Sequence, residues 1–254
     1  MIRDWLEHIA ARWAGGRFDE CQFGHGDHST LDVNLRDGAP FRVFDAPRYE
    51  TERAGYCDGR DEVSRAILAN RWWEDAGTAL IAQHCSGGAV IDIGSHVGWY
   101  TVQAAKRGCW VLAVDASVEH LRVLEHNTMD YSDQVVLCRG WIGDATPPIG
   151  VPRGTSSVKL VKIDIEGGEA DAVAALWPLF ASKFIEYALI EVSPVFTGAD
   201  KAEDTVRRLL SLGYRAYIVP NRAEQTRNMH EVTEGNVRQT MKERPQMDLW
   251  WVRC

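Results

Sequence analysis

A short glycine-bearing segment is the most chemically informative part of the sequence. It reads Asp92-Ile93-Gly94-Ser95-His96-Val97-Gly98 and completes a run of apolar residues. Glycine at two positions lets the backbone turn tightly and approach a ligand where a Cβ atom would clash. The spacing is Gly-x-x-x-Gly, whereas a dinucleotide-binding turn needs Gly-x-Gly-x-x-Gly to hold a pyrophosphate. The segment therefore predicts a strand–turn–helix site for a nucleoside without a phosphate group.

Asp115 follows the apolar run 110–114, about twenty residues beyond the turn, where an acidic side chain can bind both ribose hydroxyls. The alternative is that Asp115 only starts the loop before the next helix. Trp141 and Asp144 follow a third apolar run, and we expect them to contact an adenine ring and its amino group. The alternatives are a core position for Trp141 and a turn role for Asp144.

Three carboxylates follow two later apolar runs. Asp164 and Glu166 come after run 158–163, and Glu191 comes after run 187–190. Because the carboxyl ends of parallel strands meet at one edge of a sheet, we expect these carboxylates to share a rim. They could take a proton from a hydroxyl, or hold Mg²⁺ or a similar cation that acidifies the hydroxyl. A third interpretation gives Glu166 only a structural role beside a helix N-terminus.

His96, inside the glycine turn, is a further candidate for the general base. A histidine there can equally serve as a polar contact. A pair of histidines occurs in His25-Gly26-Asp27-His28, but no third ligand stands at a fixed spacing, so the sequence favours a loop over a metal site.

The elements that must position these residues alternate between strands and helices. This pattern predicts an α/β fold with a mostly parallel sheet of seven strands and helices on both faces. Residues 221–246 are polar, and we expect them to form a long loop over one end of the sheet. The apolar runs that predict the strands are 89–93, 110–114, 135–138, 158–163, 187–190, 214–219 and 249–252.

Residues 1–80 are expected to form an extension that packs on a core made by residues 81–254. Trp5, Ile9 and Trp13 recur at four-residue intervals and predict an amphipathic helix. Its apolar face should pack on the core, with contact to a membrane surface as the alternative. Alternating apolar residues on both sides of Asp37-Gly38 predict a hairpin, and residues 61–80 have a helical pattern.

Composition restricts the class of protein further. The 254 residues are 45% hydrophobic and 25% charged, as in ordinary globular proteins. With 28 Lys and Arg against 36 Asp and Glu, the net charge of −8 has the wrong sign for nucleic acid as the main partner. The six cysteines form no Cys-x-x-Cys pair and predict reduced thiols in a cytoplasmic protein. No segment has the ~20 apolar residues of a membrane span. The sequence makes no prediction about oligomeric state.

Two motifs together resemble the FkbM-type family of Rossmann-like methyltransferases that depend on S-adenosylmethionine (SAM). Residues 92–101 look like the family's cofactor turn, and Lys162-Ile163-Asp164-Ile165-Glu166-Gly167-Gly168-Glu169 looks like its fourth-strand signature. Trp73-Glu74, Ile190-Glu191 and Leu212-Gly213-Tyr214 add to the resemblance, which spans roughly residues 30–252. The chain departs from the family at Ser95 and His96, where the family usually has a small residue and Asn.

The resemblance implies a Rossmann-like methyltransferase fold, SAM as cofactor, and O-methylation of a carbohydrate, glycoconjugate or natural product. The acceptor would then be a small molecule or a glycan. Other acceptors, SAM binding without catalysis, and a nicotinamide-dependent oxidoreductase are the alternatives. The expected SAM contacts are Asp92, Gly94, Ser95, Gly98, Asp115, Trp141 and Asp144; the expected catalytic residues are Asp164, Glu191 and His96; the candidate Mg²⁺ ligands are Asp164, Glu166 and Glu191.

Overall fold

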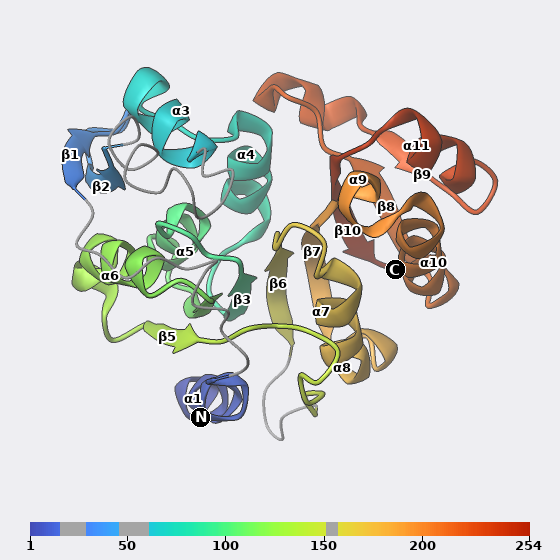
Figure 1. Ribbon diagram of the computed structural model, residues 1–254, viewed down its shortest axis with the longest axis horizontal. Helices are drawn as coiled ribbons and strands as arrows, with labels where there is room; N and C mark the ends of the chain where they lie inside the picture. Colours follow the sequence, from blue (N-terminus) through green and yellow to red (C-terminus); the bar gives the residue numbers. More distant parts are fainter. Residues whose placement is uncertain (16–28, 46–60, 151–156) are drawn as a thin grey trace.

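A computed structural model describes residues 1–15, 29–45, 61–150 and 157–254. Its centre is an eight-stranded sheet in the order β5-β4-β3-β6-β7-β10-β8-β9, with helices on both faces (Figure 1). The strands are β3 (Ala89–Ile93), β4 (Trp110–Asp115), β5 (Val135–Arg139), β6 (Val158–Ile163), β7 (Ile185–Val192), β8 (Tyr214–Ile218), β9 (His230–Val232) and β10 (Met247–Arg253).

The strand directions separate this sheet from a dinucleotide-binding domain. Strands β5, β4, β3, β6 and β7 pair in parallel, so their carboxyl ends meet at one edge. Strand β10 pairs antiparallel with both β7 and β8. Counted from β3 along the chain, the eight strands have the order 3-2-1-4-5-8-6-7, whereas a dinucleotide-binding sheet has the order 3-2-1-4-5-6. The seven predicted strands are all present.

The prediction of a long loop over residues 221–246 is wrong. This segment contains the 3-10 helix η2 (Ala223–Asn228), the strand β9 and the helix α11 (Val237–Glu243). Strand β9 extends the sheet by pairing antiparallel with β8. Both β9 and α11 are too short to show a clear apolar period, and β9 buries only Val232.

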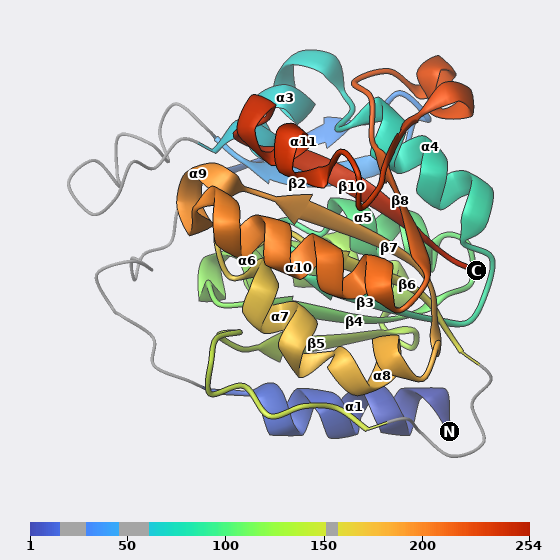
Figure 2. The same ribbon diagram turned by 90° about the vertical axis from the view of Figure 1, so that its right-hand side faces the viewer.

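The helices form two layers around the sheet. One layer, with α1, α7, α8, α10 and α11, shares a hydrophobic core with one face, and Figure 2 shows α7, α8 and α10 lying across it. The other layer contains α3, α4, α5, α6 and the hairpin β1–β2. The bounds are α1 (Ile2–Trp13), α3 (Glu62–Asn70), α4 (Asp75–His84), α5 (Trp99–Ala105), α6 (Val118–Asn127), η1 (Met129–Tyr131), α7 (Glu169–Ala175), α8 (Trp177–Ala181), α9 (Pro194–Thr197) and α10 (Ala199–Ser211), with β1 (Thr30–Asn34) and β2 (Pro40–Phe44).

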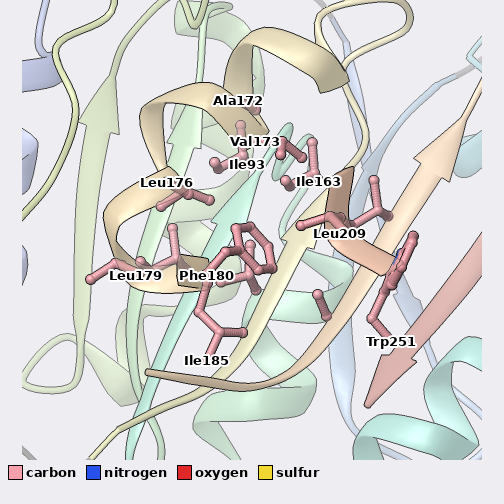
Figure 3. Close-up of a cluster of buried hydrophobic side chains, with 14 of the residues drawn as sticks. Ile93, Ile163, Ala172, Val173, Leu176, Leu179, Phe180, Ile185, Leu209 and Trp251 are labelled. Carbon is pink, nitrogen blue, oxygen red and sulfur yellow. The ribbon is translucent and has the colours of Figure 1, made fainter. Parts of the chain in front are cut away.

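Figure 3 shows how the first layer joins the sheet. Leu176 and Phe180, beside and within α8, lie against Ile163 and Ile185 of β6 and β7, and all four side chains are buried. Buried apolar contact of this kind is the main favourable term that holds a helix on a sheet. It fixes α7 and α8 directly after β6, and so fixes the loop between β6 and α7.

The N-terminal elements match most of the expectations. Helix α1 packs on β4 and β5, with Leu6, Ile9 and Trp13 buried in the core (Figure 1). The predicted hairpin forms, with β1 and β2 antiparallel. The helical pattern over 61–80 forms two helices, because Arg71 and Glu74 take left-handed backbone angles between them. The division into residues 1–80 and 81–254 stays a prediction. No helix in the described ranges is long and apolar enough to cross a membrane.

Candidate active site

The glycine turn connects the end of β3 to the start of α5 and is held by both neighbouring strands. The backbone N–H groups of Gly94 and Ser95 donate to the carbonyl of Val114 in β4, at 2.8 and 3.1 Å. A Cβ atom on Gly94 would stand 1.8 Å from the carbonyl oxygen of Asp164, which follows β6. Gly94 also has a φ of +78°. Only glycine combines this backbone conformation with this close approach.

Asp115 fixes the same turn from the end of β4. Its Oδ2 accepts a hydrogen bond from the backbone N–H of His96 at 2.8 Å. Its Oδ1 accepts from the backbone N–H of Ser117 at 2.8 Å and lies 3.1 Å from Nδ1 of His120. Burial alone would raise the pKa of Asp115, but the two neighbouring histidines and the hydrogen bonds lower it to about 2. The carboxylate predicted to bind ribose is therefore ionised and lies beside the turn.

The ring of His96 contacts other aromatic side chains. The ring centroid lies 4.1 Å from that of His120 and 6.3 Å from that of Phe44 in the hairpin. Nε2 is 3.7 Å from Oδ1 of Asp61. Burial and the neighbouring His120 lower the pKa of His96 to about 4, so the ring is neutral near pH 7. Its role as a general base stays a prediction.

Lys162 is the buried cation of the site, and the sequence analysis did not single it out. Its Nζ lies 3.2 Å from Oδ2 of Asp164 and 4.0 Å from Oδ1 of Asp92, and it donates to the carbonyl of Gly94 at 2.9 Å. Burial disfavours the charge, but Asp164 and Asp92 outweigh that effect and raise the pKa of Lys162. A lysine two residues before Asp164, within a predicted buried strand, is the signal that could have found it.

Asp92 lies at the closed side of Lys162, beneath the turn. It is 1% exposed, and its Oδ2 accepts a hydrogen bond from the hydroxyl of Thr101 at 2.6 Å. Its Oδ1 and the nearby hydroxyl of Ser95 are both buried without a hydrogen-bond partner among the described residues. Buried polar atoms normally have partners. These two atoms therefore have unused hydrogen-bonding capacity.

Further carboxyl groups lie near Asp164. Glu191, near the end of β7, stands opposite Asp248 of β10 and accepts a hydrogen bond from the hydroxyl of Ser193. Burial and the charge of Asp164 raise the pKa of Glu191 to about 7. Burial and the charges of Glu74 and Asp164 raise the pKa of Asp248 as well. Asp248 and Glu74 thus lie in the electrostatic environment of Asp164 together with Glu191, and the sequence analysis had not placed either of them there.

The predicted set of Mg²⁺ ligands is not brought together. Within the described ranges, no three His, Cys, Asp or Glu side chains lie where they could hold a metal ion. Asp164 is paired with Lys162, and Glu191 is bonded to Ser193. Glu166 occupies the tight turn before α7 with a φ of +48°. The three carboxylates thus have different partners, although their strands end at the same edge.

Trp141 and Asp144 lie in the segment that follows β5. The ring of Trp141 is 43% exposed, which excludes the core position that was the alternative for it. The backbone N–H of Trp141 donates to the carbonyl of Gly15 at 3.3 Å, so the end of the N-terminal segment holds this loop. Asp144 is exposed. Their contacts with adenine stay predictions, and the pair His25 and His28 lies outside the described residues.

Comparisons with known proteins give matches at the level of structure. No protein-family model and no curated protein sequence matches the chain. A candidate SAM-dependent methyltransferase from Listeria monocytogenes is 16% identical, with 70% of this chain and 99% of that chain covered, at a TM-score of 0.45. A candidate O-methyltransferase from Klebsiella pneumoniae is 14% identical over 70% and 79% of the two chains, at 0.41. A candidate rRNA methylase from Clostridium thermocellum is 12% identical over 72% and 100%, at 0.45.

The fold of this chain is thus the one expected from its sequence. Five parallel strands end at one edge, a glycine turn joins the first of them to a helix, and β10 enters antiparallel between β7 and β8. The chain has a Rossmann-like α/β fold, with one strand more than the seven predicted.

Proposed function

We propose that the protein is a SAM-dependent methyltransferase of the FkbM type. It transfers a methyl group to a hydroxyl of a carbohydrate, glycoconjugate or natural product. The observation that carries this proposal is the bond between the backbone N–H of His96 and Asp115, which fixes an ionised carboxylate beside the Gly-x-x-x-Gly turn. An ionised carboxylate beside such a turn suits the two hydroxyls of a ribose. The turn also lacks the features that hold a pyrophosphate.

The residues at the turn suit SAM. Asp115 would hold the ribose hydroxyls, and the turn from Gly94 to Gly98 would lie against the rest of the cofactor. The unpartnered oxygens of Asp92 and Ser95 offer acceptors to a ligand that carries a positive charge and several donors. Trp141 and Asp144 would contact the adenine. When bound, SAM supplies an electrophilic methyl group on a positively charged sulfur.

Glu191 is the proton acceptor in this proposal. An alcohol is a weak nucleophile until its proton leaves, and a base works best with a pKa near the working pH. The pKa of Glu191, raised to about 7 by burial and by Asp164, meets this condition. Asp164, fixed by Lys162, would orient the acceptor hydroxyl. Because Asp164 already has a cationic partner, the proposal uses a protein base in place of Mg²⁺.

The acceptor is proposed to be a small molecule or a glycan, and the site of action the cytoplasm. The net charge of −8 opposes a nucleic-acid acceptor. The described cysteines Cys85, Cys109, Cys138 and Cys254 are free thiols, which suits a reducing compartment.

Transfer of labelled methyl from SAM into a fractionated host extract tests the proposal. We expect label in the glycan or small-molecule fraction, at the same rate with and without a chelator. Asp115→Ala should lose the transfer. Label in nucleic acid would contradict the proposed acceptor, and loss of transfer with chelator would contradict the metal-free base.

A further inference from the structure

The side chain of Glu74 does not cap the helix that the residue precedes. Glu74 precedes α4 with a φ of 40° and a ψ of 74°, and its side chain makes no capping hydrogen bond to that helix. Its Oε2 accepts a hydrogen bond from the hydroxyl of Tyr100 in α5. Its Oε1 has no hydrogen-bond partner within the described ranges, and the residue is only partly buried. One carboxylate oxygen is therefore held, and the other is available.

Gly77 makes room for the contact between Tyr100 and Glu74. A Cβ atom at position 77 would stand 2.3 Å from the hydroxyl oxygen of Tyr100 and 3.6 Å from Oε2 of Glu74. Gly77 lies inside α4 and does not have a positive φ, so its backbone does not require glycine. Glycine weakens a helix relative to alanine. The space it leaves admits the Tyr100 hydroxyl to Glu74.

Tyr100 also links Glu74 to the centre of the site. Nζ of Lys162 lies 5.6 Å from the centroid of the Tyr100 ring and pairs on its other side with Asp164. The charge of Asp164 adds to the effect of burial in raising the pKa of Glu74. Glu74 therefore belongs to the same electrostatic environment as the proposed reaction centre. Beyond Lys162, Oδ1 of Asp92 is buried 4.0 Å from the Lys162 Nζ and lacks a hydrogen-bond partner in the described part of the chain.

We propose that Glu74 determines acceptor specificity: its free oxygen binds a donor group of the acceptor, and its charge disfavours anionic acceptors. This rests on the proposed function. With Glu191 at the hydroxyl to be methylated, Glu74 provides a second anchor, so the acceptor carries at least two donor groups. A neutral polyol or an amino sugar meets this requirement. A uronic acid or a phosphorylated sugar does not, because its negative charge would face the carboxylates of Glu74 and Asp164.

The test compares the full-length protein with Glu74→Gln, which keeps the size of the side chain and removes its charge. The probe is labelled methyl from SAM, transferred into the small-molecule and glycan pool of a host extract. The products are then separated by anion exchange into anionic and non-anionic fractions. Calorimetry with SAM alone measures cofactor binding in the same preparations.

We expect the wild type to label the non-anionic fraction. Glu74→Gln should lower that rate by about tenfold or more, since a charge-assisted hydrogen bond is lost. It should also raise the ratio of anionic to non-anionic label, while the Kd for SAM stays within about twofold. A variant that merely distorts the site would lower both fractions alike. The ratio therefore separates specificity from structural damage.

Two further variants provide a second test and a control. Gly77→Ala pushes the Tyr100 hydroxyl away from Glu74 and should lower the non-anionic rate as Glu74→Gln does, even if Glu74→Gln folds poorly. Asp75→Asn changes the next residue, which lies on the outer side of α4 and pairs with Arg36 at 3.0 Å. It should leave both the rate and the ratio unchanged.

The outcomes separate this inference from the proposed function. A wild-type rate and ratio in Glu74→Gln would overturn the inference and leave the methyltransferase intact. Wild-type label found mainly in the anionic fraction would also overturn it. A wild-type protein that binds no SAM, or labels no fraction, would contradict the proposed function and the inference with it.

Discussion

The backbone N–H of His96 lies 2.8 Å from Oδ2 of Asp115, and this bond joins the turn after β3 to the end of β4. The same carboxylate binds the backbone N–H of Ser117 at the start of the next helix. Asp115 thus shapes the turn as well as offering charge to a ligand. A substitution there is expected to alter the backbone of the site together with its chemistry.

Gly94→Ala should destabilise the protein and abolish SAM binding, because the added Cβ would meet the carbonyl oxygen of Asp164. Gly108→Ala is the matched control: Gly108 also has a positive φ, +76°, but a Cβ there meets no described atom within 4 Å. We expect the free energy of unfolding of the control to fall by only about 1–2 kcal/mol, the cost of a side chain at positive φ. The control should bind SAM normally. Equal stability and equal affinity of the two variants would contradict the close approach of β3 to β6.

Asp115→Asn should reduce stability at neutral pH and lose this effect in acid. A carboxyl whose folded-state pKa is lowered to about 2 stabilises the fold above its usual pKa of 3.8, and this contribution disappears as the pH falls through about 2. Urea unfolding at pH 7 and at pH 2 measures the difference. Asp130→Asn, at an exposed position in η1, serves as the control. If the difference in the free energy of unfolding between wild type and Asp115→Asn were the same at both pH values, the ionised carboxylate would not be the cause.

Lys162→Met should destabilise the protein strongly, by about 3–5 kcal/mol, because Asp92 and Asp164 would keep their charges without the buried partner. Denaturant unfolding at pH 7 measures the loss. Lys159→Met provides the comparison, since its Nζ pairs with Glu186 at the less buried start of β6. A loss no larger than that of Lys159→Met would show that Lys162 does not hold the site together.

The methyl-transfer rate should depend on the ionisation of Glu191. Its pKa is raised to about 7, so the fraction of ionised base, and with it the rate, should rise about tenfold per pH unit below that value and level off above it. Glu191→Gln should be slow and lack this dependence. Rates with SAM at saturation, measured between pH 5 and 9, test the assignment. An unchanged profile in Glu191→Gln would assign the proton to another group.

Helix α1 should contribute to the stability of the core. Ile9 is fully buried against β4 and β5, so Ile9→Ala is expected to cost about 2–5 kcal/mol. His8→Ala, at the adjacent exposed position, should change stability by less than about 0.5 kcal/mol. Thermal and denaturant unfolding of the two variants compare them directly. Similar stabilities would mean that α1 is not part of the cooperative fold.

The sequence predicts the sheet better than it predicts the site. Apolar runs of four to six residues in a parallel sheet are buried on both faces, so β3 to β8 and β10 are visible without the structure. The carboxylates Asp164 and Glu191 are also predictable, because strand order alone brings strand ends to one edge. Strand β9 and helix α11 are too short for a period to stand out.

The remaining site residues depend on contacts between distant segments. Tyr100 meets Glu74 only because α4 and α5 pack together and Gly77 leaves space. Asp248 meets Glu191 through the pairing of β10 with β7. No local pattern records either contact. The expected metal set does not form among the described residues, where Asp164 pairs instead with Lys162, two positions before it in the chain.

Calorimetric titration of the purified protein with SAM tests the central claim most directly, with Asp115→Ala and NADH as the two comparisons. We predict that the wild type binds SAM, that Asp115→Ala retains its fold but loses at least tenfold in affinity, and that NADH does not bind. Wild-type binding of NADH without SAM, or unchanged SAM affinity in Asp115→Ala, would contradict the assignment of this turn to SAM.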